Sequence, residues 1–292
     1  MIKAIDVHAH PSTRAAAQSM LKYQKALMQY YQKRKMTDEE VLSMSKSEDD
    51  MAQDFVDANV RGIIVAWDAE SNTGEPATSN DYIAKLTSDH PEAYIGGFAS
   101  VDPWKGEMAI KEADRSIKEL GLMGVKFQQS AQAFYPNDRR FYPLWEKCSE
   151  LKAPVMFHTG TTGLGAGMPG GMGIHLKYTK PIPYIDDVAA DFPNLLIIAC
   201  HPSWPWQDEM IAVMIHKANV VMELSGWSPK YFSPALKKEL HGRLQDRAMF
   251  GTDYPMIPHQ KLFDAYEAEG YREDILEKIF LKNAQRILGI EI

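Results

Sequence analysis

The sequence predicts a (β/α)8 barrel, also called a TIM barrel, for its 292 residues. Short apolar runs rich in β-branched residues alternate along the chain with stretches of helical periodicity. Such alternation indicates parallel βαβ units, and eight units in one chain are typical of this barrel. No linker-like or low-complexity segment divides the chain, so we expect a single domain over residues 1–292.

The apolar runs have the length and composition of buried strands, and polar or turn-forming residues follow each of them. The predicted strands are residues 2–7, 61–67, 94–100, 124–127, 154–158, 195–201, 219–224 and 248–253. The intervening periodicity predicts helices over residues 14–35, 49–59, 80–88, 106–120, 139–151, 184–191, 207–217 and 234–244. Two extra helices close the chain, the second over residues 276–288.

Two connections are longer than the barrel requires. The helix over residues 14–35 is an insertion after the first strand, and its apolar stripe suits either a lid or a subunit contact in a homodimer or larger homo-oligomer. The glycine-rich segment 160–173 follows the fifth strand. It lacks the lysine and Ser/Thr ending of a P-loop, so we expect a mobile flap at the active site.

Composition narrows the class of protein. The formal net charge is −7 at pH 7, which argues against a nucleic-acid or anionic-membrane surface. Cys148 and Cys200 are the two cysteines, and their spacing matches no metal or redox motif. The sequence shows no signal-peptide pattern and no apolar run near the roughly 20 residues of a membrane span. We therefore expect a cytoplasmic protein that acts on a small molecule.

Potential metal ligands stand at four strand ends: His8 and His10 at the first, His158 at the fifth, His201 at the sixth and Asp253 at the eighth. Residues two apart in a strand share a face, so His8 and His10 can point at the same spot. In a (β/α)8 barrel all strand C-termini face one end, where active sites lie. Each residue alone suits an ordinary polar contact, but their convergence predicts a metal site.

Five motifs resemble the amidohydrolase superfamily. They are DVHAH at residues 6–10, MFHTG at 156–160, ACHPSWPW at 199–206, GTDYP at 251–255 and KNAQRIL at 282–288. The sequence is most similar to the amidohydrolase-related branch, which includes aminocarboxymuconate-semialdehyde decarboxylase, resorcylate-type decarboxylases and lactone hydrolases.

The resemblance implies roles for these residues. His8, His10, His158 and Asp253 would hold one divalent metal ion, and His201 would be the acid/base histidine beside it. Zinc is the usual metal of the family, and manganese is the next. Members with two metals bridge them with a modified lysine on the fourth strand, where this chain has Lys126. The resemblance therefore allows either one metal ion or two.

The chemistry of the donor set agrees with these roles. Three imidazoles and a carboxylate with open positions form a Lewis-acid site that lowers the pKa of a bound water towards about 7. Asp253 can take a proton from that water and return it to a leaving group, and His201 can polarise or protonate the substrate.

Tryptophans just beyond strand ends indicate the substrate class. One such residue alone would suit packing at the barrel rim, but together they predict an aromatic pocket for a planar or cyclic ligand. With Lys126 as a cation for a carboxylate, the predicted substrate-binding residues are Trp67, Trp104, Lys126, Trp204 and Trp227.

Three functions follow from this site. We expect first a metal-dependent hydrolase that opens a small cyclic or aromatic acid, lactone or amide with metal-activated water. The alternative enzyme is a nonoxidative decarboxylase of an aromatic or muconate-type acid, which can use the same residues. The alternative from another class is a noncatalytic metal-binding barrel.

Overall fold

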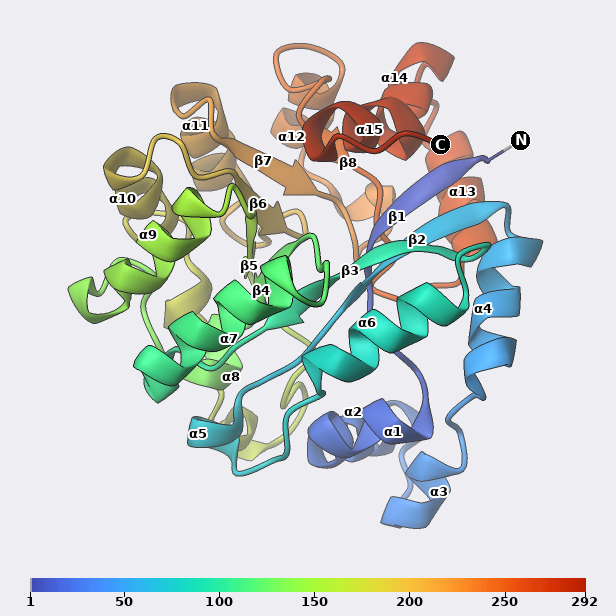
Figure 1. Cartoon of the computed structure of the whole chain (residues 1–292). Helices are drawn as coiled ribbons and strands as arrows, with labels where there is room; N and C mark the ends of the chain where they lie inside the picture. The colour runs from blue at the N-terminus through green and yellow to red at the C-terminus, as the bar shows by residue number, and fades with distance from the viewer. Residues whose placement is uncertain (1) are drawn as a thin grey trace.

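One eight-stranded parallel sheet forms the centre of the computed structural model, which describes residues 2–292 (Figure 1). The strands are hydrogen-bonded in chain order, from β1 to β8. They are β1 Ala4–Ala9, β2 Val60–Val65, β3 Tyr94–Ser100, β4 Gly124–Phe127, β5 Val155–His158, β6 Ile197–Cys200, β7 Val220–Glu223 and β8 Ala248–Met249. The structure confirms the predicted (β/α)8 barrel.

The first strand also lies beside the chain around β8. The Val7 amide donates to the Phe250 carbonyl (3.1 Å), and the Asp253 amide donates to the His8 carbonyl (3.0 Å). A parallel bridge between Ala9 and Tyr254 continues this pairing. These contacts close the sheet into a barrel and place the ends of β1 and β8 next to each other.

Helices surround the sheet (Figure 1). They are α1 Arg14–Ala17, α2 Leu21–Gln32, α3 Asp38–Leu42, α4 Glu48–Asp57, α5 Glu70–Thr73, α6 Asn80–Asp89, α7 Glu107–Lys118, α8 Gln129–Gln132, α9 Tyr142–Glu150, α10 Tyr184–Asp191, α11 Gln207–His216, α12 Pro234–Leu240, α13 His259–Ala268, α14 Glu273–Glu277 and α15 Asn283–Leu288. In residues 2–292, no helix has the length and apolar character needed to cross a bilayer.

Several predicted elements differ in their bounds from the structure, among them the insertion, the eighth strand and the last helix, which the segment η7 Lys278–Lys282 divides. The insertion 14–35 is not one helix, because the 3₁₀ segment η1 Gln18–Met20 separates α1 from α2. The helix α2 ends where Lys33 adopts a left-handed conformation (φ 53°). The predicted strand 248–253 is shorter, since β8 ends at Met249 and Asp253 also has a positive φ of 58°.

Strand alternation divides the apolar core into two layers. One layer fills the barrel interior and includes Ile5, Val7, Ile63, Phe98 and Met156, with Ala284 and Ile290 of the C-terminal region packed in the same cluster. The other layer lies between the sheet and the surrounding helices. Both layers are almost fully buried, so they hold the strand ends that carry the site in fixed positions.

Candidate active site

Two histidines and an aspartate form a compact group at the strand ends. The Nε2 atoms of His8 and His10 lie 3.3 Å apart, as expected for residues two apart at the end of a strand. Asp253 Oδ1 lies 3.6 Å from His8 Nε2 and 3.3 Å from His10 Nε2. These donor atoms are close enough together to ligate one ion, and nitrogen and carboxylate donors suit Zn²⁺ and Mn²⁺.

Irregular backbone aims these side chains. The register in which β1 pairs with β2 shifts between Asp6 and Ala9, so the strand is irregular beside His8. Asp253 has a left-handed backbone (φ 58°), which aspartate tolerates better than most residues. Both departures from regular strand geometry occur where a side chain must turn into the site.

His158 and His201 lie beside this group and contact each other. His201 Nε2 is 3.0 Å from His158 Nδ1, and the ring of His201 is centred 5.1 Å from that of His8. The other ring nitrogen of His158, Nε2, faces the Thr161 carbonyl at 3.1 Å. The structure therefore places His158 next to His201 and outside the compact group, so its role as a metal ligand stays a prediction.

Burial controls the protonation of the site. It lowers the pKa of His8 and of His158 well below the ordinary value, and it lowers the pKa of His201 to about 4. For Asp253, burial acts to raise the pKa, but the hydrogen bond from His10 and the neighbouring imidazoles bring that pKa well below its usual value. Near neutral pH the site therefore offers neutral imidazoles and an ionised carboxylate, the forms that bind metals.

Lys126 lies in the barrel interior on β4 and is 3% exposed. Its Nζ donates to Cys200 Sγ at 2.9 Å, and burial raises the pKa of that thiol, which keeps the sulfur protonated. The Lys126 charge also contributes to the lowered pKa values of His8 and His201, so it acts on the same site. In the described chain it forms no ion pair with a carboxylate, which leaves its charge available to an anionic ligand.

The four tryptophans predicted to bind substrate lie in different surroundings. Trp204 and Trp227 pack together with ring centroids 5.6 Å apart, and Trp204 is 47% exposed. Trp67 is buried in a small apolar cluster with Ala69 and Ala131.

Trp104 packs edge-on against Phe141 and donates its indole N–H to the Gln132 carbonyl (2.7 Å). These contacts are those of a residue packed at the rim. Of the four predicted tryptophans, the structure brings only Trp204 and Trp227 into mutual contact among the residues it describes.

The glycine-rich segment is attached to the chain after β6. The Thr161 amide donates to the Trp204 carbonyl at 2.7 Å. Gly160 has a φ of 83°, and a Cβ there would lie 2.5 Å from the Trp204 carbonyl oxygen, so only glycine fits this approach. Further along, Gly163 and Gly167 face Leu27 and Tyr30 of α2. The inserted helix therefore packs on the flap within the same chain.

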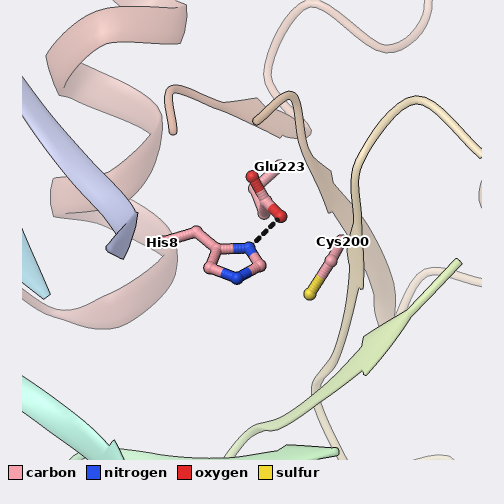
Figure 2. A group of neighbouring side chains, drawn as sticks. All are labelled: His8, Cys200 and Glu223. Carbon is pink, nitrogen blue, oxygen red and sulfur yellow. Dashed lines mark hydrogen bonds and ion pairs between the residues drawn. The ribbon is translucent and has the colours of Figure 1, made fainter. Parts of the chain in front are cut away.

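Sequence reasoning missed a buried carboxylate, Glu223, at the end of β7. It lies inside the barrel beside His8, and Figure 2 shows the two side chains pointing at each other. Its signal was present, since it is the one acidic residue in the predicted strand 219–224 and lies next to the end of that strand. Asp6 has a different place: it accepts from the backbone amides of His8 and Thr252 (3.1 Å each) and from the His259 ring (3.0 Å), so it ties β1 to the chain after β8.

Comparison with known proteins shows similarity over the whole barrel. The sequence model of the amidohydrolase family matches residues 5–290. The decarboxylase orsB of Emericella nidulans is 24% identical over 261 residues, which cover 74% of this chain and 76% of that protein. The 2-amino-3-carboxymuconate-6-semialdehyde decarboxylase of Dictyostelium discoideum is 34% identical over 79 residues, or 27% of this chain and 22% of that protein.

Solved structures share the fold. An uncharacterised TIM-barrel protein from Bordetella bronchiseptica has a TM-score of 0.77 at 24% identity, over 98% of each chain. The 5-carboxyvanillate decarboxylase of Novosphingobium aromaticivorans, solved with manganese and 4-hydroxy-3-methoxy-5-nitrobenzoic acid, has a TM-score of 0.68 at 17% identity, over 98% of this chain and 95% of that one. A probable 2-pyrone-4,6-dicarboxylic acid hydrolase from Acinetobacter baumannii has a TM-score of 0.67 at 14% identity, over 99% of this chain and all of that one.

Proposed function

Since the chain belongs to the amidohydrolase family, we propose that it is a metal-dependent, nonoxidative decarboxylase of an aromatic or muconate-type acid. The observation that carries this choice is the similarity to a decarboxylase over 74% of the chain. Sequence motifs alone put hydrolysis first, and the decarboxylase relatives reverse that order. Family membership also agrees with the resemblance seen in the motifs.

A divalent cation, zinc or manganese, fits the group formed by His8, His10 and Asp253, with His158 as the further predicted ligand. The support is the convergence of two imidazole nitrogens and a carboxylate oxygen, together with the lowered pKa values of His8 and Asp253, which favour a neutral ring and an ionised carboxylate. When bound, such an ion supplies Lewis-acid chemistry towards substrate oxygens.

The side chains around this group supply binding and proton transfer. The buried ammonium of Lys126 is placed to neutralise a substrate carboxylate, and the Trp204–Trp227 pair offers a surface on which a planar ring can stack. In decarboxylation the C–C bond breaks, CO2 leaves, and the electron pair left on carbon takes a proton. His201 is the proposed proton-transfer residue: burial lowers its pKa to about 4, so the ring is neutral near neutral pH and must first take up, from water or the substrate, the proton that it then passes to the carbon.

Hydrolysis of a lactone is the second candidate. The fold similarity to a probable 2-pyrone-4,6-dicarboxylic acid hydrolase favours keeping it, since that protein shares the barrel over its full length. Decarboxylation and lactone hydrolysis can use the same side chains, so only the identity of the product distinguishes the two reactions.

The test is a substrate panel with two readouts. Protein loaded with zinc or manganese is incubated with hydroxybenzoates, carboxymuconate-type acids and pyrone or other lactones, while CO2 release and product mass are measured. We expect CO2 and a product that has lost its carboxyl group, with metal-stripped protein as the control. Ring opening with uptake of water and without CO2 would support the second candidate instead, and no turnover of any acid or lactone would count against both.

A further inference from the structure

Glu223 is a fully buried carboxylate whose two oxygens accept from several donors. Oε1 lies 2.8 Å from His8 Nδ1, 3.1 Å from the His201 amide and 3.0 Å from Ser225 Oγ. Oε2 accepts from the Ser225 amide at 2.8 Å. An ionised carboxylate is acceptor-only, so it matches this ring of donors, whereas an amide would set its own N–H groups against some of them.

The carboxylate determines where His8 carries its proton. Figure 2 shows the contact between Oε1 and the His8 ring; because an ionised Oε1 can only accept, this contact assigns the imidazole proton to Nδ1 and leaves a lone pair on Nε2. That Nε2 is the atom that faces His10 Nε2 at 3.3 Å and Asp253 Oδ1 at 3.6 Å. Glu223 thus prepares His8 to offer a lone pair towards the compact group, as carboxylates behind metal-binding imidazoles do.

The same oxygen also holds His201. Its backbone amide donates to Oε1, and His201 has a left-handed φ of 68°, a conformation that costs energy for this residue type. Ser225 extends the link, because its Oγ lies 2.9 Å from His201 Nδ1 as well as 3.0 Å from Oε1. One carboxylate therefore fixes the ring of His8 and the backbone of His201.

The surroundings of Glu223 are built closely around it. A Cβ on Gly251 would lie 2.6 Å from Glu223 Oε2. The chain after β8 therefore comes so close to this carboxylate that only glycine fits at position 251. Within residues 2–292, His8 is the only basic side chain within ion-pair distance of Glu223, and burial lowers the pKa of that imidazole and favours its neutral form. A buried carboxylate without lysine or arginine is expensive to maintain, which argues against a purely structural salt bridge.

We propose that Glu223 is the positioning residue of this site: it fixes the Nδ1–H tautomer of His8 for metal binding and anchors the backbone that presents His201. The importance of Glu223 for turnover rests on the proposed function. Its two direct consequences, the tautomer of His8 and the affinity for metal, can be measured without turnover.

The first experiment uses the wild-type protein. Nitrogen-15 NMR of labelled histidines in metal-stripped protein, with His8 assigned by its loss in His8→Gln, should show a neutral ring protonated at Nδ1. A His8 ring protonated at Nε2 would overturn the proposal, whatever the behaviour of any variant.

The second experiment compares variants. Glu223→Gln should weaken zinc binding by about 10- to 100-fold in a chelator competition, the usual effect of losing such a support, and should change the His8 nitrogen signals. Glu223→Asp should recover part of the affinity. Glu239→Gln is the matched control, since Glu239 is also nearly buried but pairs with Arg243.

Wild-type zinc affinity and an unchanged His8 tautomer in Glu223→Gln would disprove the positioning role. A protein that binds zinc with the expected tautomer but decarboxylates nothing would instead refute the proposed function alone. If Glu223→Gln does not fold, the wild-type tautomer and Glu223→Asp still decide.

Discussion

The Nε2 atom of His201 lies 3.0 Å from the Nδ1 atom of His158. The outer nitrogen of each ring faces a carbonyl, Thr161 O at 3.1 Å for His158 and Ser225 O at 3.0 Å for His201. Carbonyls only accept, so both outer nitrogens carry protons, and two neutral rings would turn lone pairs towards each other. One additional proton between the rings would satisfy this contact, but burial lowers the pKa of both imidazoles, so near neutral pH both rings are mostly neutral. This geometry suits a pair that takes up a proton and passes it on.

Replacing His201 should therefore reduce chemistry more than metal binding. We expect His201→Asn to lower turnover by roughly 100-fold or more, as for other positioned acid/base groups. Asparagine tolerates the left-handed backbone at this position (φ 68°), so the fold should persist. Metal content by mass spectrometry should match the wild type and the control His241→Asn, whose ring stacks on Tyr271. Loss of metal in proportion to activity would make His201 a ligand.

The compact group predicts about one divalent ion per chain. Asp253→Asn keeps the shape of the side chain and suits its φ of 58°, but removes the charge that faces His8 and His10. This variant should bind metal at least about 100-fold more weakly than the wild type, because loss of an outer partner of a ligand alone costs about 10- to 100-fold. Elemental analysis after dialysis against a chelator measures the change.

A wild-type protein that holds no stoichiometric metal, even after supplementation, would contradict the metal site itself. Two tightly bound ions per chain would instead make Lys126 a ligand.

Acid should destabilise the metal-stripped protein in a defined range. His201 has a pKa of about 4 when folded, against about 6.5 when unfolded, so between these values the unfolded chain binds a proton that the folded chain does not. The free energy of unfolding should therefore fall as the pH decreases from about 6.5 towards 4. His8 and His158 act in the same direction, because burial lowers their pKa as well.

Urea unfolding at several pH values measures this dependence. The His201→Asn variant should lose part of the slope, and an unchanged slope would show that this histidine does not titrate as described. Asp253 contributes in a separate range, since its lowered pKa means that its stabilisation is lost only below about pH 3.9.

Local patterns were sufficient to predict the barrel but not the contacts inside it. Alternation along β1 predicted that His8 and His10 would lie side by side, because the side-chain period of a strand is a local property. The contact between His8 and Glu223 joins residues 215 apart in the chain. It depends on how the sheet closes into a barrel and on the register of the strands, and neither is a local property of the sequence. Neither the left-handed backbone of His201 nor that of Asp253 has a sequence signature comparable to that of glycine.

The tryptophans also show that contacts inside the barrel cannot be predicted from local sequence patterns. All four lie at or just beyond predicted strand ends, yet Trp67 is buried in its own cluster and Trp104 packs on Phe141. Sequence position tells which end of the barrel a residue occupies, but the conformation of the following loop decides whether the ring faces the site. The loop after β6 and the loop after β7 bring Trp204 and Trp227 together, and the others diverge.

The Trp204–Trp227 pair should contribute to affinity for planar acids. Trp204→Ala or Trp227→Ala is expected to raise KM by about tenfold, which corresponds to about 1.4 kcal/mol of lost binding, with kcat and metal content little changed. Trp104→Ala is the matched control, because its indole N–H is satisfied by the Gln132 carbonyl and its ring packs on Phe141. Quenching of tryptophan fluorescence by aromatic acids, compared among the three variants, gives the binding effect separately from turnover. If both Trp204→Ala and Trp227→Ala keep the wild-type KM, these rings only pack at the rim, and the preference for a planar substrate loses its structural support.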